Sequence, residues 1–460
     1  MRLALGVTAL NGTKVDLSVF LAKCSTFRIK SRRRSNNMLS MGWAWWRRWA
    51  VLLSGLAGLQ FLIQLLNGIT GFLLVRSLPR EEYSVFTITG TLLTMLLMLT
   101  DLGLTVGLIN IGGRVWKDRN QHALLVADAL KLRFVLFLIC VCFIAPIGGG
   151  LLIKAGATAK EAVLLMSLIL LSAGIGASAL IHATVARLHS RHRELQVAEL
   201  YAAASRLAAS AAGLVAAAAA LVASAAVVLS QWVFGARMRR ISLEILGPLP
   251  EASNDYRAEL AGTLRSLGPT AIFYGFQGQV ATLLIAMFGT GGQVADLGAL
   301  SRYNILFSIS GVVMAQVVSP AAARATDGQH FRHILRLALL SYAGFSGLII
   351  LGVAVFWRLA LGLLGEQYLG LRSELILFMV SSALAGLNGL LWCFISARGW
   401  IHHVWVIIPM TLVFQAVLVR WLPLDTVASV LFFGAFSTLP GTLWFLWRGL
   451  TNFSRMHAFQ

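Results

Sequence analysis

The chain has 460 residues, of which 58% are hydrophobic and only 12% are charged, and its formal net charge is +20. A soluble domain of this size could not stay in solution with that composition, which excludes a soluble enzyme and indicates a polytopic membrane protein. The basic residues lie mostly between apolar runs, where they fit membrane topology and anionic headgroups, so we expect no nucleic-acid partner.

The N-terminal region, residues 1–49, resembles neither a membrane span nor a signal peptide, because its apolar opening is short and many basic residues follow. We expect it to be a disordered cytoplasmic tail. The four cysteines contain no C-x-x-C pair, so neither a disulfide framework nor a zinc site is indicated.

Two apolar runs follow, at about residues 50–75 and from Tyr83 onward, and each is long enough to cross a bilayer. Both carry polar side chains at steps of three and four, which stacks them on one helix face. The first face holds Gln60, Gln64 and Asn67, and the second holds Thr87, Thr91, Thr94, Asp101 and Thr105. Since lipid would not tolerate such a face, above all the carboxylate of Asp101, the pattern predicts a cavity inside a helix bundle.

The remaining apolar runs predict about twelve spans in all, arranged as two lobes of six helices. The N-lobe, residues 50–236, closes with an alanine-rich stretch that we interpret as two spans joined by a tight turn near Ala217 to Ala220. A polar cytoplasmic linker is expected at 237–261, because this segment holds prolines and many charges. The C-lobe then covers 262–447 and a cytoplasmic tail covers 448–460.

The C-lobe spans are expected at about 262–288, 296–319, 337–356, 373–395, 403–419 and 426–447. Arginines and lysines are concentrated in alternate loops, around Arg114, Arg187, Arg237 and Arg324. By the positive-inside rule these loops face the cytoplasm, which places both termini there as well.

The two lobes match in register. Arg114 and Arg324 are 210 positions apart, Arg187 and Arg398 are 211 apart, and Tyr83 and Leu297 are 214 apart. Six spans return the chain to its starting side, so the copies should be parallel repeats related by an axis along the membrane normal. This architecture predicts a substrate between the lobes and transport by alternating access.

Several short motifs carry a family resemblance. They are L-P-x-E-x-Y-x-x-F from Leu78 to Phe86, D-L-G-L from Asp101 to Leu104, Gly365-Glu366-Gln367-Tyr368, and Ala397-Arg398-Gly399. In their order and spacing they resemble the polysaccharide-biosynthesis flippases of the multidrug/oligosaccharidyl-lipid/polysaccharide exporter superfamily. The resemblance implies translocation of undecaprenyl-diphosphate-linked oligosaccharide units across the bacterial inner membrane, for O-antigen, capsule or exopolysaccharide. It also implies polysaccharide polymerase and chain-length machinery as partners.

Such a substrate needs hydrogen-bonding walls and fixed cations. The candidate anion-binding residues are Arg302, Arg206, Arg133 and Lys131, because guanidinium grips phosphate oxygens bidentately. The candidate walls are Gln60, Gln64, Asn67, Thr94, Tyr274, Gln277 and Asn304. Alternatively, each polar side chain joins two helices, Lys131 pairs with Asp128, and Glu199 neutralises Arg206.

The driving force and the function have open alternatives. No G-x-x-x-x-G-K-[ST] sequence occurs, so we expect no nucleotide cofactor and treat Asp101 and Glu199 as possible proton or sodium sites. A multidrug or cation antiporter would need an acidic, aromatic cavity, whereas the arginines within the predicted spans favour an anionic substrate. Lipid II flippases resemble this layout with two further C-terminal spans, and a membrane glycan polymerase or ligase would need a long catalytic outer loop. We therefore favour the repeat-unit flippase.

Overall fold

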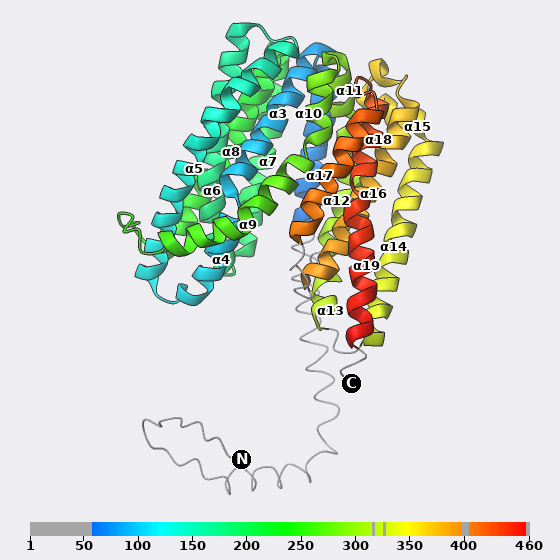
Figure 1. Cartoon of the computed structure of the whole chain (residues 1–460). Coiled ribbons are helices and arrows are strands. Elements are labelled where there is room, and N and C mark those ends of the chain that lie inside the picture. Colours follow the sequence, from blue (N-terminus) through cyan, green and yellow to red (C-terminus); the bar gives the residue numbers. More distant parts are fainter. Residues whose placement is uncertain (1–57, 315–317, 325–327, 398–403, 457–460) are drawn as a thin grey trace, which may run out of the picture. The chain divides into compact units, whose positions relative to one another are not determined.

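The computed structural model describes residues 58–314, 318–324, 328–397 and 404–456 (Figure 1). The expected tail 1–49 and the Arg398-Gly399 part of the Ala-Arg-Gly motif lie outside these residues. Within the described ranges all regular structure is helical. The all-α fold predicted from the sequence is therefore confirmed.

The first half of the described chain, residues 58–246, is a bundle of long helices. They are an initial helix Gly58–Ser77, α3 (Arg80–Asp101), α4 (Leu104–Val115), α5 (Arg119–Lys154), α6 (Ala159–Leu188), α7 (His192–Ala216) and α8 (Ala220–Leu246). Local chemistry fixes several starts: the Asp118 carboxylate accepts two backbone N–H groups of α5, and Thr158 and Glu161 form a capping box at α6. The predicted turn near Ala217 is confirmed, since α7 ends at Ala216.

The second half, residues 257–456, is more interrupted. It contains α9 (Arg257–Gln277), α10 (Val280–Phe288), α11 (Gly291–Leu300), the 3₁₀ turn η2 (Ser301–Tyr303), α12 (Asn304–Val313), α13 (Ser319–Arg324), α14 (Gly328–Val355), α15 (Trp357–Leu364), η4 (Glu366–Tyr368), α16 (Arg372–Ala397), α17 (Val404–Trp421), α18 (Val427–Ser437) and α19 (Leu439–Met456). The span predicted at 262–288 is two helices, α9 and α10, bent by 55° at Gly278 and Gln279. The span predicted at 296–319 is divided by η2.

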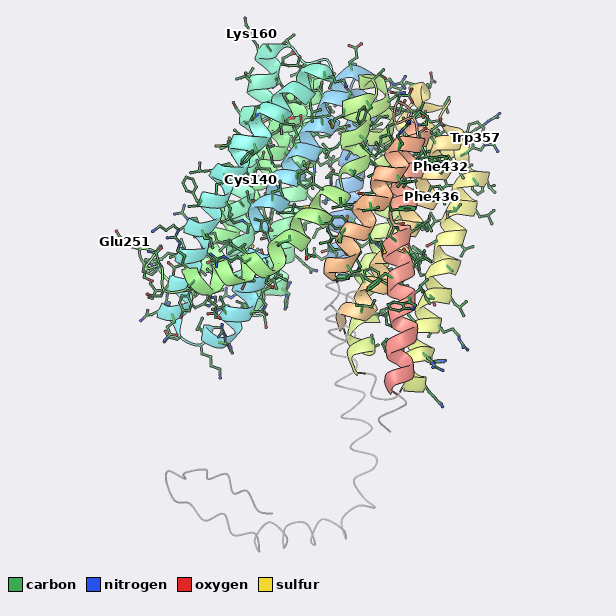
Figure 2. The ribbon with its side chains drawn as sticks, in the orientation of Figure 1. Cys140, Lys160, Glu251, Trp357, Phe432 and Phe436 are labelled. Atoms are coloured by element: carbon green, nitrogen blue, oxygen red, sulfur yellow. The ribbon has the colours of Figure 1, made fainter. Side chains whose placement is uncertain are left out.

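Eight of the described helices are long and apolar enough to cross a membrane, and α9 with α10 makes a ninth if the bent pair is one span. The other predicted spans correspond to α7, to α11 with α12, and to α17. Figure 2 shows Lys160 at one end of the first half and Glu251, in the connection after α8, beside the other end, with Cys140 between them. We call the Lys160 end the outer end and the Glu251 end the inner end, following the topology predicted from the loop charges.

The second predicted span is shorter than its sequence pattern suggested. α3 ends at Asp101 because Leu102 and Gly103 adopt the left-handed conformation, with φ of 42° and 85°. Glycine has no Cβ and takes this conformation at little cost, so the D-L-G-L motif breaks the helix. The expectation of one polar face from Thr87 to Thr105 is therefore wrong beyond the break, and the chain continues as the separate helix α4.

The connection between the halves is held on the first half. α8 continues to Leu246, so Arg237, Arg239 and Arg240, expected in the linker, lie on a helix. The Asp128 carboxylate on α5 accepts the backbone N–H groups of Asn254 and Tyr256, at 2.9 and 3.0 Å. Both oxygens of Asp128 are thus engaged by the connection.

The buried apolar side chains show how the halves meet. At the outer end one cluster joins both halves, with Phe86 and Leu92 from the first and Leu297, Phe378 and Phe433 from the second. At the inner end the described clusters are separate: one lies among α4, α5, α6, α8 and the start of α9, and another among α13, α14 and α16. The halves therefore share a core at the outer end. At the inner end the two clusters are separate, and the first takes in Leu260 at the start of α9, where Arg114 of α4 also pairs with Glu259.

Candidate functional site

A cavity of about 390 Å³ lies where the two halves meet. The first half contributes residues of α3 and the Arg206 side chain of α7. The second half contributes residues around α10, α11, η2, α16 and α18. The lining residues are Phe86, Thr87, Gly90, Thr91, Thr94, Arg206, Gly278, Gln279, Ala281, Thr282, Leu297, Gly298, Ser301, Arg302, Asn304, Phe378, Ser381, Val430, Leu431 and Gly434.

One wall is the threonine face of α3. Thr87, Thr91 and Thr94 each donate the hydroxyl proton to a carbonyl of their own helix, at 2.8, 3.0 and 2.8 Å. Their oxygens therefore keep lone pairs that can accept from a ligand hydroxyl. Across the cavity edge Gly298 approaches so closely that a Cβ there would lie 2.2 Å from the Thr87 hydroxyl oxygen, so this contact between the halves requires glycine.

Arg302 is held at the cavity by Tyr83. Its Nε donates to the Tyr83 hydroxyl at 2.8 Å, and that hydroxyl donates to the Gly298 carbonyl at 3.2 Å. Tyr83 is fully buried, and its ring centre lies 5.7 Å from the Arg302 guanidinium carbon. The aliphatic part of Arg302 packs against the initial helix, where a Cβ on Gly71 would meet it at 2.9 Å. These contacts hold the Nε edge of the guanidinium group, which remains in the cavity lining.

Arg206 supplies a second positive charge to the same cavity. It is close enough to Arg302 for the two guanidinium groups to repel each other. No aspartate or glutamate occurs among the described residues that line the cavity. No described acid forms an ion pair with either arginine, and Glu199 interacts with Arg187 instead. The cavity is therefore cationic, and an anion would relieve the repulsion between its arginines.

The second half adds neutral hydrogen-bonding groups. Asn304 lines the cavity and its side-chain oxygen accepts from Ser382 at 3.0 Å. Sequence reasoning missed Gln279, Thr282, Ser301 and Ser381, which also line the cavity. Tyr83 was also missed as a site residue, although it precedes Thr87 by one turn and so belongs to the same face.

Other predicted wall residues lie outside this cavity. Gln60, Gln64 and Asn67 are on the initial helix, half-buried or exposed, and do not line it. Tyr274 packs against the Trp392 ring, with centroids 6.0 Å apart. Gln277 donates to Ser437 at 3.1 Å and accepts from Gln415 at 2.7 Å, so it joins three helices.

The remaining predicted charges are separate from the cavity as well. The Arg133 guanidinium lies 3.2 Å from the Asp101 carboxylate, which also accepts the Thr105 hydroxyl. Lys131 is exposed, and Asp128, one turn before it, is bonded to the connection between the halves. Of the four predicted anion-binding residues, the structure brings together Arg302 and Arg206.

Polar contacts close the outer end above the cavity. Arg80 at the start of α3 donates to both carboxylate oxygens of the buried Asp296 on α11, at 2.5 Å. Lys154 at the end of α5 donates to the Met287 carbonyl. Tyr368 of the Gly-Glu-Gln-Tyr loop is buried beside the Arg80 and Asp296 charges, and burial raises the pKa of its hydroxyl above the usual value, so it stays neutral.

Comparison with known proteins identifies the architecture. No protein-family profile and no curated protein matches the sequence. An inward-facing multidrug-resistance transporter of the MATE family, within the MOP superfamily, superposes with a TM-score of 0.68 at 15% identity, over 86% of this chain and 96% of that chain. The fold is that of the MATE transporters.

Two further structures support this assignment of the fold. An outward-facing MATE transporter gives a TM-score of 0.59 at 14% identity, over 87% of this chain and 94% of that chain. A MOP-superfamily transporter from Pyrococcus furiosus gives 0.56 at 16% identity, over 87% of this chain and 94% of that chain, and its binding pocket is described as having reverse polarity that suggests a different function. The MATE fold confirms the two-lobed, multi-pass membrane architecture predicted from the sequence.

Proposed function

We propose that this protein is a bacterial inner-membrane flippase that moves undecaprenyl-diphosphate-linked oligosaccharide repeat units to the periplasmic face by alternating access. The observation that carries the proposal is the cavity charge: Arg206 and Arg302 line it, and no described lining residue is acidic. One guanidinium group can donate to two phosphate oxygens at once. Two such groups therefore suit a diphosphate held away from bulk water.

The rest of the cavity suits sugar. The oxygens of Thr87, Thr91 and Thr94 accept hydrogen bonds, while the amides of Gln279 and Asn304 offer both donors and acceptors. Its volume of about 390 Å³ is at the lower end of ligand pockets. We expect it to hold the diphosphate and the adjoining sugar, with the remaining sugars in the space that opens when the halves separate.

The distribution of buried contacts supports alternating access. The halves share a large core and the Arg80–Asp296 ion pair at the outer end. At the inner end only the start of α9 packs on the first half, through Leu260 and the Arg114–Glu259 pair, and the described cluster of α13, α14 and α16 is separate. The higher TM-score to the inward-facing than to the outward-facing neighbour agrees with an inward-facing state. In this proposal both termini are cytoplasmic, and the product is passed to polymerase and chain-length machinery outside.

A gradient of protons or sodium is the proposed driving force, with Asp101 and Glu199 as coupling carboxylates. Neither residue lines the cavity, so coupling would have to act through helix contacts. Transport by Asp101→Asn and Glu199→Gln, measured against pH, tests this part. An unchanged pH profile in both variants would remove ion coupling through these groups and leave the anion site unaffected.

Multidrug efflux is the alternative function on the same fold. A cationic drug gains from acidic or aromatic groups, and the described cavity has two arginines in place of acids. Fold alone does not separate the two functions. The substrate charge is therefore the property to test.

The decisive experiment is deletion of the gene in its host, with measurement of undecaprenyl-linked repeat units and of surface polymer. We expect repeat units to accumulate inside, with rescue by the wild type and by Arg420→Ala, an exposed arginine outside the cavity. Stably expressed Arg302→Ala should fail to rescue. Normal surface polymer in the deletion strain, in the absence of a second flippase gene, would reject the proposal and favour drug efflux.

A further inference from the structure

A second large recess lies on the first half, away from the central cavity. It has a volume of about 680 Å³, lies between α5, α6 and α8, and shares no lining residue with the cavity. Most of its lining is apolar. The lining residues are Leu130, Arg133, Phe134, Phe137, Leu170, Leu171, Gly174, Ile175, Ala177, Ser178, Ala179, Trp232, Gly235, Ala236 and Arg239. We call this recess the α5–α6–α8 groove.

The charged groups of the groove are all at its inner end. α5 runs outward from Arg133 to Phe137, whereas α8 runs inward from Trp232 to Arg239. Beyond Arg133, α5 has no charged residue until Lys154, a stretch about as long as a bilayer span. α6 has none between Glu161 and Arg187, and α8 has none before Arg237. Arg133 and Arg239 therefore mark the level of the inner headgroup layer.

Arg133 is unusual among the buried groups there. Its side chain is 2% exposed, and none of Nε, Nη1 and Nη2 makes a hydrogen bond with the described residues, although Asp101 lies 3.2 Å from Nη1. Arg239 is exposed at the same end. Buried guanidinium donors without acceptors are costly, and a phosphate oxygen would satisfy them.

We propose that the α5–α6–α8 groove binds an anionic phospholipid of the inner leaflet, with the phosphate at Arg239 and Arg133 and one acyl chain along the apolar wall. Basic pockets between spanning helices on the cytoplasmic side are suited to anionic headgroups. Phe134, Leu171 and Trp232 are more than half exposed, so the wall is open to the bilayer. The occupant is a resident bilayer lipid, and this inference does not depend on the cargo of the central cavity.

The test is native mass spectrometry of the delipidated protein with dioleoyl phosphatidylglycerol or dioleoyl phosphatidylcholine at equal concentration. We expect the wild type to retain the anionic lipid preferentially. Arg239→Gln should weaken its binding about fivefold, because one basic residue near anionic lipid contributes about 1 kcal/mol. Arg240→Gln is the matched control, since this neighbouring arginine pairs with Glu244 at 3.1 Å and does not line the groove.

Gly174→Leu tests the acyl-chain part separately. A Cβ at Gly174 would meet only the Phe137 ring, at an ordinary 3.7 Å, so the backbone accommodates the change while the leucine fills the groove. Binding of phosphatidylglycerol should then be lost with the melting temperature retained. Equal retention of both lipids by the wild type, or equal losses in Arg239→Gln and Arg240→Gln, would overturn the proposal. So would loss of added undecaprenyl phosphate, but not of phosphatidylglycerol, in Gly174→Leu.

Discussion

Arg133 and Arg302 differ in burial and in the groups beside them, since Arg133 is buried and Arg302 is half-buried. Arg133 is almost fully buried in the first half and lies 3.2 Å from the Asp101 carboxylate. Arg302 is bonded to the Tyr83 hydroxyl and lines the same cavity as Arg206, with no described acid in the cavity lining. Arg133 thus has a counter-charge inside the fold, although its donors make no hydrogen bond with the described residues, whereas no described acid pairs with Arg302. The neighbouring group, a carboxylate or a neutral hydroxyl, decides whether such an arginine has a counter-charge inside the protein.

Removing the acid beside Arg133 should have the largest effect on stability. Asp101→Asn leaves a guanidinium buried without a counter-charge, and breaking a buried pair in this way costs about 3–5 kcal/mol. We expect a large fall in the unfolding midpoint of the purified protein in detergent.

The matched variants are Arg302→Met and the double variant Asp101→Asn with Arg133→Met. Arg302→Met removes the hydrogen bond to Tyr83 but also a charge that another arginine repels, so its midpoint should fall far less than that of Asp101→Asn. The double variant should recover most of the loss, because no unpaired charge remains. Equal destabilisation by Asp101→Asn and Arg302→Met would mean that both arginines are structural.

Loss of the Tyr83 hydroxyl should have an intermediate effect. Tyr83→Phe keeps the buried ring and removes the 2.8 Å bond from Arg302, which lowers stability by about 1 kcal/mol. Because Arg302 is then free to turn, we expect repeat-unit transport to fall several-fold at equal expression.

Tyr342→Phe is the control for this variant. Its hydroxyl donates to the Ala383 carbonyl at 2.8 Å, between α14 and α16 and outside the cavity lining. Stability should fall by a similar amount, and transport should not change. If the two variants lower transport equally, the bond between Tyr83 and Arg302 has no special part in substrate binding.

The sequence predicts the spans well, because an apolar run of bilayer length has few alternatives. Four of the residues predicted for the site, Arg206, Arg302, Thr94 and Asn304, line one cavity in the structure. Periodicity is reliable along one helix, which explains the success of the threonine face of α3.

The site predictions that failed depend on neighbours distant in sequence or on backbone conformation. The pattern through Asp101 assumed a continuous helix, and the left-handed Leu102 and Gly103 interrupt it. Asp101 then lies beside Arg133 of α5, a contact that no spacing within α3 encodes. Similarly, Ser381 and Ser382 are adjacent serines, and only the packing of α16 shows that Ser381 lines the cavity while Ser382 donates to Asn304.

Two glutamines at the bend between α9 and α10 should differ in their effects on stability and on transport. Gln277 bonds to Gln415 and Ser437, whereas Gln279 lines the cavity. Gln277→Leu should lower stability by about 0.6 kcal/mol for each of its two hydrogen bonds, the average between membrane helices, and leave transport nearly unchanged. Gln279→Leu makes the same chemical change two residues later and should lower transport without lowering the unfolding midpoint. Both variants remove one amide at the same bend. A larger transport defect in Gln277→Leu than in Gln279→Leu would place the substrate beside Gln277 and would contradict the cavity described above.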